Sequence, residues 1–175
     1  MRGMYQVLTQ AIGFVATALQ IGSFQCKSSR KLIFMQLCGN TAFLLHMFML
    51  GAYSGCVSLL ISVIRNFVLT SRRSWAYWKG WPWLLVAANL IGTALTWESV
   101  FSILPCIAVV SLTIAGWSRN GKKIRIANMC VASPSWLIYE FYTGSYSGIV
   151  TELFTLGSVG ISVLRYGWKA LDTTE

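Results

Sequence analysis

Four ionisable side chains lie inside stretches of the sequence that are otherwise apolar: His46, Arg65, Glu140 and Glu152. Placing such a group in a membrane span costs about 2.5–3.5 kcal/mol on insertion scales, so it usually faces the protein interior and has a partner. Counted along a helix, His46, Glu140 and Glu152 fall in the outer half of the bilayer. We predict that these three form an outer polar cluster that can respond to protons; hydrogen bonding for packing is the alternative.

Arg65 lies about 10 Å from the inner end of its predicted helix. It can bind a substrate oxygen, pair with Glu152, or extend its long side chain inward. Asn40 and Asn66 lie on adjacent predicted spans, and Trp136 lies in the middle of another. We therefore expect Asn40, Arg65, Asn66 and Trp136 to bind substrate near a central cavity. Amides also hold membrane helices together, which is the alternative role for each asparagine.

Two prolines, Pro105 and Pro134, fall within the fifth and sixth predicted spans. Proline removes a helical hydrogen bond, so we expect both to act as hinges. The sequence has no phosphate-binding glycine loop with a lysine, no HExxH and no GxSxG. His46 is the only histidine, and the five cysteines form no CxxC pair. We expect no catalytic residue, no metal site and no cofactor, and we interpret the protein as not an enzyme.

These side chains must be held by helices in a membrane, because charge is absent from most of the chain. No Lys, Arg, Asp or Glu occurs in residues 3–25, 32–64, 80–97 or 99–118, and only 11% of the 175 residues are charged. A soluble domain has about 25%. A helix needs about 20 apolar residues to cross a bilayer, so the run 32–64 folds back on itself, at Gly51–Gly55.

We predict seven spans in an all-α membrane protein. They are Tyr5–Ser23, Leu32–Leu50, Tyr53–Ser71, Trp81–Thr96, Ser99–Trp117, Ile126–Tyr142 and Tyr146–Leu164. Of the 14 Lys and Arg residues, all but Arg2 and Arg65 fall in alternate connections or at the C-terminal end. Basic loops stay in the cytoplasm, which predicts an outside N-terminus and a cytoplasmic C-terminus. The net charge of +9 is then a topology signal, and nucleic acid is not expected as a partner.

The sequence partly matches itself after a shift of 93 residues. Gly51-Ala-Tyr-Ser-Gly55 corresponds to Gly144-Ser-Tyr-Ser-Gly148, so two corners have nearly the same sequence. This predicts one membrane domain, residues 1–175, with a 3+1+3 arrangement of parallel repeats: repeat 1 (1–73), a linker helix (74–97), repeat 2 (98–169) and a short cytoplasmic tail (170–175). Parallel repeats hold substrate sites at their interface. Duplication for packing alone is the alternative.

Several segments together resemble the YgjV family of small bacterial inner-membrane proteins. They are Gly13-Phe14, Gln20–Phe24, Arg30-Lys31, His46–Gly55, Ile64–Asn66, Trp136–Gly144 and Val163–Arg165. The resemblance covers nearly the whole chain and implies a multi-pass protein of the bacterial inner membrane. It brings no biochemical activity with it.

A more distant resemblance is to the PQ-loop and SWEET-type sugar transporters. Leu19-Gln20 followed by Lys27-Ser28 is similar to their Pro-Gln and Lys-Ser signature, although the proline is missing and the second repeat has Leu112-Thr113. Those transporters have hinge prolines in four helices and paired pocket asparagines, whereas Asn66 corresponds to Val159 here. The resemblance implies the 3+1+3 plan, an outside N-terminus and a sugar as solute.

The sequence therefore predicts a protein that moves a small polar solute through a bilayer by rocking two triple-helix units. The rival interpretation is a non-transporting membrane scaffold or partner subunit. The expected partners are the lipid bilayer and a small polar solute, and assembly into a homo-oligomer is left open.

Overall fold

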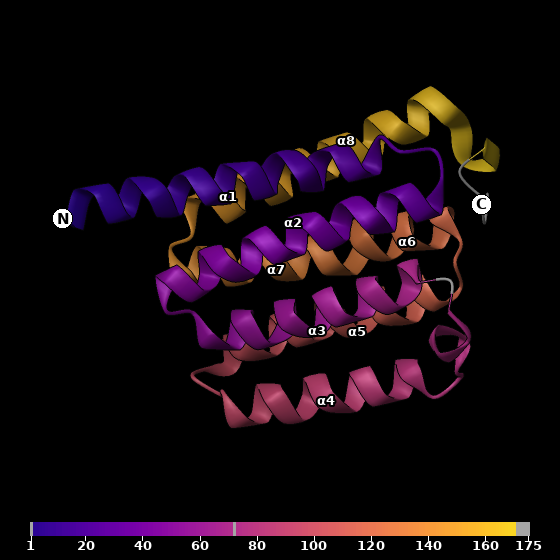
Figure 1. Ribbon diagram of the computed structural model, residues 1–175. Coiled ribbons are helices and arrows are strands. Elements are labelled where there is room, and N and C mark those ends of the chain that lie inside the picture. The colour runs from indigo at the N-terminus through magenta and orange to yellow at the C-terminus, as the bar shows by residue number, and fades with distance from the viewer. Residues whose placement is uncertain (1, 72, 171–175) are drawn as a thin grey trace.

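The computed structural model describes residues 2–71 and 73–170, and in this part of the chain it is helical without a strand (Figure 1). The helices are α1 (Arg2–Phe24), α2 (Ser29–Leu50), α3 (Tyr53–Thr70), η1 (Ser74–Tyr77), α4 (Trp81–Leu95), η2 (Val100–Ser102), α5 (Ile103–Trp117), α6 (Gly121–Ala127), η3 (Asn128–Ala132), α7 (Ser133–Thr143) and α8 (Tyr146–Ala170). Arg72 and residues 171–175 of the predicted tail lie outside the described residues.

Five helices are long and apolar enough to cross a membrane. They are Val7–Phe24, Arg30–Leu50, Tyr53–Thr70, Val100–Trp117 and Tyr146–Gly167. The apolar helix Trp81–Leu95 is shorter, at 15 residues. The region predicted as the sixth span is divided into α6, η3 and α7, which follow one another without a gap. The prediction of an all-helical membrane protein is confirmed, and the prediction of seven spans is confirmed only in part.

Glycine ends two of the helices in the same way. Gly51 follows α2 with φ 76°, and Gly144 follows α7 with φ 69°, both in the left-handed region that side chains disfavour. The next amides, of Ala52 and Ser145, donate back to the carbonyls of Met47 and Glu140. Both corners are therefore tight, and they place the start of α3 and of α8 directly beside the preceding helix.

The long helices form a closed ring. Along this ring α1 packs on α2, α2 on α3, α3 on α5, α5 on α7, α7 on α8, and α8 on α1. In Figure 1, α1, α2 and α3 lie in front, with α8, α7 and α5 behind them. Helix α4 is outside this ring at the lower edge and packs on α3 and α5. The ring positions the candidate site, because side chains from both layers point into it.

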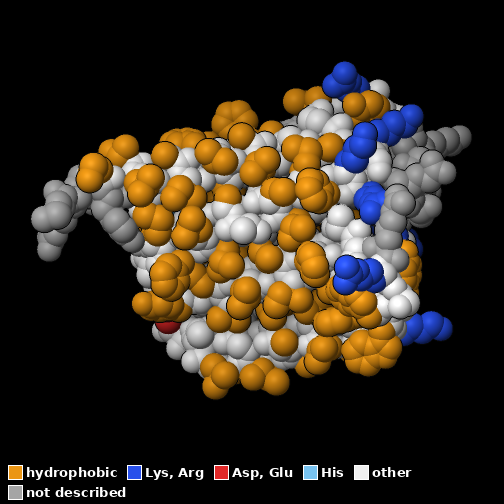
Figure 2. Space-filling view, viewed as in Figure 1, with side chains coloured by type: hydrophobic (Ala, Val, Ile, Leu, Met, Phe, Trp, Pro, Cys, Tyr) orange, Lys and Arg blue, Asp and Glu red, His pale blue; other side chains and the backbone are white. Residues whose placement is uncertain are grey.

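The surface has an apolar flank and a basic end. Large apolar side chains are exposed on most helices, for example Leu95 (82%) and Leu164 (87%), as expected for contact with lipid tails. On the face in Figure 2, Lys and Arg side chains gather at one end of the bundle. The start of α1 and the end of α8 lie at opposite ends of the bundle (Figure 1), so the described chain crosses it an odd number of times.

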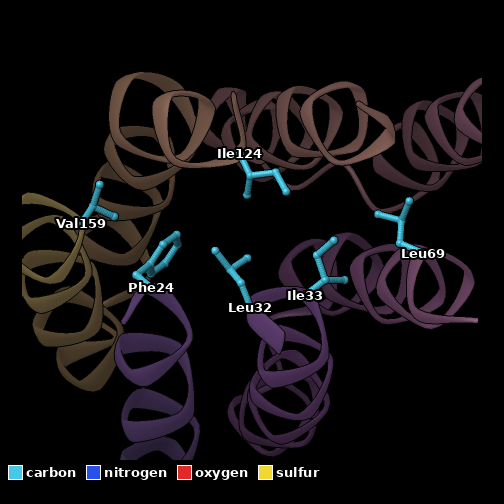
Figure 3. Packing of buried hydrophobic residues seen from close by; sticks show 6 residues of the cluster. All are labelled: Phe24, Leu32, Ile33, Leu69, Ile124 and Val159. Carbon is cyan, nitrogen blue, oxygen red and sulfur yellow. The ribbon is translucent and has the colours of Figure 1, made fainter. Parts of the chain in front are cut away.

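An apolar cluster fills the interior at the basic end (Figure 3). It consists of Phe24, Leu32, Ile33, Leu69, Ile124 and Val159. The first four come from the end of α1, the start of α2 and the end of α3, and the last two from the middle of α6 and of α8. Arg125 lies in the next position of α6 and is fully buried. Its guanidinium donates to the carbonyls of Phe24 (3.2 Å), Cys26 (2.6 Å) and Gly121 (3.1 Å). The charge pattern placed Arg125 in a basic connection before the predicted span Ile126–Tyr142, and this is wrong: it belongs to a helix and is buried, because the carbonyls at the end of α1 need a donor.

The two prolines lie in different local structures. Pro134 is the second residue of α7, two residues after the π-helical turn η3, as expected where a proline disturbs the hydrogen bonds of the preceding turn. Pro105 lies in the first turn of α5, which follows the 3-10 turn η2 without a gap. Both prolines thus stand beside an irregular helical turn, and their role as hinges stays a prediction.

Candidate functional site

A central cavity of about 40 Å³ lies inside the helix ring. It is lined by Gln20, Gln36, Asn40, Phe43, Met47, Leu59, Ser62, Arg65, Leu112, Asn128, Trp136, Glu140, Glu152 and Thr155. These residues come from α1, α2, α3, α5, η3, α7 and α8. One water needs roughly 10–15 Å³ of such volume, so the cavity has space for about three waters or one small ion.

Three of the four predicted substrate residues line the central cavity: Asn40, Arg65 and Trp136. Asn66 does not line it, but its Oδ1 accepts a hydrogen bond from Arg65 Nε at 3.0 Å. Gln20 Nε2 donates to Asn40 Oδ1 at 3.2 Å and links α1 to α2 beside the cavity. Three of the four residues thus share one space, with Asn66 hydrogen-bonded to Arg65 beside it, and their role in binding stays a prediction.

The two membrane carboxyl groups also line the central cavity, from α7 and α8. Glu140 is 3% exposed and Glu152 is 9% exposed. The Ser133 hydroxyl lies beside the Glu152 carboxyl and accepts a hydrogen bond from Asn128 Nδ2 at 3.1 Å. Glu140 packs against Gly148 at the start of α8, where a methyl group would overlap its carboxyl. Both carboxyls are therefore fixed in place by neighbouring small or hydroxylated residues.

Several polar atoms at the central cavity have no hydrogen-bond partner within the described chain. They are Gln20 Oε1, Arg65 Nη1, Glu140 Oε2 and Thr155 Oγ1, with Asn66 Nδ2 close by. Each unsatisfied buried polar group costs about 1–3 kcal/mol, and more when it is charged. Native proteins seldom leave such groups alone, so this set indicates a place for water, an ion or a solute.

His46 does not join Glu140 and Glu152. Its Nδ1 donates to the carbonyl of Thr9 at 2.8 Å, and its Nε2 accepts from the Ser147 hydroxyl at 3.1 Å. Both ring nitrogens are therefore occupied on the side of the cavity away from the basic end. The predicted cluster of three is divided: two carboxyls line the cavity, and the imidazole bridges α1, α2 and α8.

Tyr139 was not singled out from the sequence, and it makes a contact of the same kind. Its hydroxyl lies 2.6 Å from Ser54 Oγ and accepts from the Gly55 amide at 3.2 Å. Tyr139 and Ser54 belong to α7 and α3, so the contact crosses the ring. Tyr139 is the counterpart of His46 in the 93-residue shift, and this was the available signal. We call His46–Ser147 and Tyr139–Ser54 the crossed contacts.

Different residues thus pack at the two ends of the helix ring, the apolar cluster at the basic end and the crossed contacts at the other end. A ring of apolar helices around a buried polar space, with apolar side chains on its outer flank, defines a multi-pass helical membrane protein. A model of the Imp-YgjV family, described as bacterial inner membrane protein, matches residues 7–169. The chain belongs to this family, as its sequence segments predicted.

One relative is the inner membrane protein YgjV of Escherichia coli strain K12. It is 26% identical over 163 residues, which cover 93% of this chain and 85% of that protein. No solved structure matches the chain. Membership in the family therefore comes with a location in the bacterial inner membrane and without a described activity.

Proposed function

We propose that this protein moves a small polar solute across the inner membrane by rocking two triple-helix units around the central cavity. The observation that carries the proposal is a central cavity with four unpartnered polar atoms, on two helices of the front layer and two of the back layer. A protein that only serves as a scaffold gains nothing from such unpaired groups. No chemical conversion of the solute is proposed.

The crossed contacts support two equivalent units, α1–α3 and α5–α8, with α4 as the linking helix. Ser54 and Ser147 are 93 residues apart, and so are His46 and Tyr139. In each contact the second helix of one unit meets the start of the last helix of the other unit. Such a reciprocal pair is expected when two like units face each other across a pseudo-two-fold axis.

The lining of the central cavity follows the same spacing. Four pairs of lining residues are 93 positions apart: Phe43 and Trp136, Met47 and Glu140, Leu59 and Glu152, Ser62 and Thr155. Two ring contacts correspond as well. Phe43 meets His46 with centroids 6.1 Å apart and 80° between planes, and Trp136 meets Tyr139 at 5.9 Å and 76°. These pairs support a cavity that lies on the axis between the units.

The orientation that we propose has the basic end in the cytoplasm and the N-terminus outside. Lys and Arg gathered at one end support it, because short basic loops stay inside. Fusion of a periplasm-dependent and a cytoplasm-dependent reporter to each end tests it. The proposal expects the two termini in different compartments, and termini in one compartment would refute the two-unit arrangement.

A movement of the units requires a place where a helix can bend. The π-helical turn Asn128–Ala132 before Pro134 is the candidate, since its hydrogen bonds are already displaced and Asn128 lines the cavity. At about 40 Å³ the cavity is an occluded form, and a solute as large as a sugar would need it to widen. The hydrogen-bonding groups of Asn40 and Arg65 suit the oxygen atoms of a small polar solute.

Sided labelling tests transport without knowledge of the solute. Ser62 and Thr155, on opposite sides of the cavity, are replaced one at a time by cysteine in a chain whose five native cysteines are changed to alanine or serine. A membrane-impermeant maleimide is then applied to intact spheroplasts and to inverted vesicles. The proposal expects both positions to react from both sides, because the cavity opens alternately.

The matched control is Thr93→Cys on α4, which is buried like the other two but does not line the cavity. It should react from neither side. The rival function is a scaffold or partner subunit, and the small volume of the cavity is the observation in its favour. If Ser62→Cys and Thr155→Cys are as unreactive as Thr93→Cys, the scaffold is correct and transport is refuted.

The solute class is found by measuring the melting temperature of purified protein with sugars, amino acids and organic acids. A ligand of the cavity stabilises the folded state by mass action, so the transported class should raise the melting temperature. Arg65→Ala should insert normally and lose this response. Normal insertion with an unchanged response and unchanged transport would end the functional role of Arg65.

A further inference from the structure

The central cavity holds one more acidic side chain than basic side chains. Arg65 contributes one positive charge from α3, and Glu140 and Glu152 contribute two carboxyls from α7 and α8. The other lining residues are neutral. All three charged groups are nine-tenths buried or more, and an uncompensated charge at such depth is costly. Electroneutrality therefore requires one further positive charge in this space.

Three oxygen atoms at the cavity have no partner, and a cation could bind to them. Gln20 Oε1, Glu140 Oε2 and Thr155 Oγ1, on α1, α7 and α8, have no hydrogen bond within the described chain. Carboxylate, amide and hydroxyl oxygens are the ligands that hard cations prefer. The unpartnered atoms are thus mostly acceptors, which fits a cation better than an anion.

The size of the cavity limits the cation to a small one. About 40 Å³ accommodates a sodium ion with one or two waters, or a hydrated proton, and excludes an organic cation in this conformation. Gly148 contributes by leaving room for the Glu140 carboxyl, since any side chain at this position would overlap it. Gly148 is therefore a positioning residue for one of the two carboxyls.

The acidic character belongs to one unit alone. The positions 93 residues before Glu140 and Glu152 are Met47 and Leu59, which line the other side of the same cavity. Packing within the first unit is satisfied by apolar residues at these positions. The two carboxyls are therefore not needed for packing, and their charge needs another explanation.

We infer that the central cavity binds one monovalent cation, a sodium ion or a proton, between the carboxyls of Glu140 and Glu152. Resting on the proposed function, we further infer that this cation moves together with the solute. Either ion places a single positive charge at a carboxylate oxygen. A sodium ion makes the melting temperature depend on sodium and a proton makes it depend on pH, so one experiment separates them.

A response to pH could also come from titratable groups near the two carboxyls. Arg65 is the only other charged residue that lines the cavity within the described chain. His46 on α2 and Tyr139 on α7 belong to the crossed contacts, away from the basic end. Helix α5 contributes Leu112 to the lining, and its Cys106 accepts from Asn89. His46→Gln therefore serves as the control for a response to pH that arises outside the cavity.

The test is the melting temperature of the purified full chain in detergent as sodium replaces choline at constant ionic strength, at neutral and at acidic pH. The inference expects a rise with sodium, or a rise on acidification that is independent of sodium and persists in His46→Gln. Glu140→Gln and Glu152→Gln, which keep the shape and remove the charge, should lose the rise. Glu98→Gln, on an exposed carboxyl outside the ring, should keep it.

Direct counting completes the test and does not depend on stability. One radioactive sodium ion, or one proton taken up from solution, should bind per chain. Gly148→Ala keeps every charge and should reduce this binding at least tenfold. No response to either ion, or the same response in Glu140→Gln and Glu152→Gln as in the wild type, would overturn the inference. Labelling of Ser62→Cys from both sides would then still leave the proposed transport standing.

Discussion

The two ends of the helix ring are packed with different kinds of side chain. Toward the basic end, six apolar side chains pack together and the Arg125 guanidinium joins α6 to the end of α1. Toward the opposite end, the closure consists of hydroxyl, phenol and imidazole groups in the crossed contacts. Water can replace a polar contact at little cost, because it offers similar hydrogen bonds. Water that enters an apolar cluster gains no such bonds.

This difference teaches that the two closures need not open with equal ease. We expect the end with the crossed contacts to open more readily than the basic end. Under the proposed transport, the first opening would therefore be away from the basic loops. The following predictions weaken one closure at a time, starting with the largest expected effect.

Arg125→Ala should have the largest effect. The carbonyls of Phe24 and Cys26 lose their side-chain donor, and each buried acceptor without a partner costs about 1–3 kcal/mol, so we expect a loss of roughly 4 kcal/mol. Denaturant unfolding in mixed micelles measures it. Arg73→Ala, on an exposed side chain, is the matched control and should change stability by less than about 0.5 kcal/mol. Equal losses of stability in the two variants would show that the contact between Arg125 and the end of α1 is unimportant.

Phe24→Ala weakens the apolar cluster itself. The phenyl ring is fully buried at the meeting point of α1, α2 and α8, and its removal should cost about 3 kcal/mol. It should also raise the labelling rate of Ser62→Cys from the cytoplasmic side. The exposed Phe14→Ala provides the comparison and should leave that rate unchanged. A higher rate only from the opposite side would contradict the assignment of the cluster.

Tyr139→Phe weakens the opposite closure by one hydroxyl. Two hydrogen bonds disappear while the ring remains, so the expected loss is about 1 kcal/mol. Labelling of Ser62→Cys from the outside should become faster, and labelling from the cytoplasm should not. The matched change Tyr53→Phe affects an exposed ring and should do neither. An unchanged labelling rate in Tyr139→Phe would show that the crossed contacts do not limit access to the cavity.

Ser147→Ala should have the smallest effect, about 0.5 kcal/mol, because His46 keeps its hydrogen bond to Thr9. If the crossed contacts are two halves of one closure, its effect on outside labelling adds to that of Tyr139→Phe without changing its direction. Opposite effects of the two substitutions on outside labelling would show that the contacts do not act together. The double variant, measured beside both single variants, decides this point.

Much of this arrangement can be predicted from the sequence, since lipid imposes strong rules. Runs without charge predict the long helices, and the predicted span Tyr53–Ser71 nearly coincides with α3. The placement of Asn40, Arg65 and Trp136 around one space follows from the cost of polar groups in lipid, which forces them inward. Glu140 and Glu152 were expected to face the interior for the same reason.

Other features depend on packing that spacing does not reveal. Arg125 reads as a loop residue because basic residues cluster around it, and only the end of α1 beside α6 explains its burial. His46 was expected beside Glu140, since the sequence does not show that Thr9 and Ser147 already occupy both ring nitrogens. Pro105 lies in a first turn because α5 begins later than the apolar run suggests.

The most direct test of two units rocking about a central cavity is a pair of spin-label distances in lipid nanodiscs. Labels at Tyr53 and Tyr146 report on the end with the crossed contacts, and labels at Lys31 and Lys123 report on the basic end; all four residues are exposed. The account predicts that Tyr139→Phe lengthens the first distance and Phe24→Ala the second, each without lengthening the other. If neither distance differs between the wild type and the two variants, the account is contradicted.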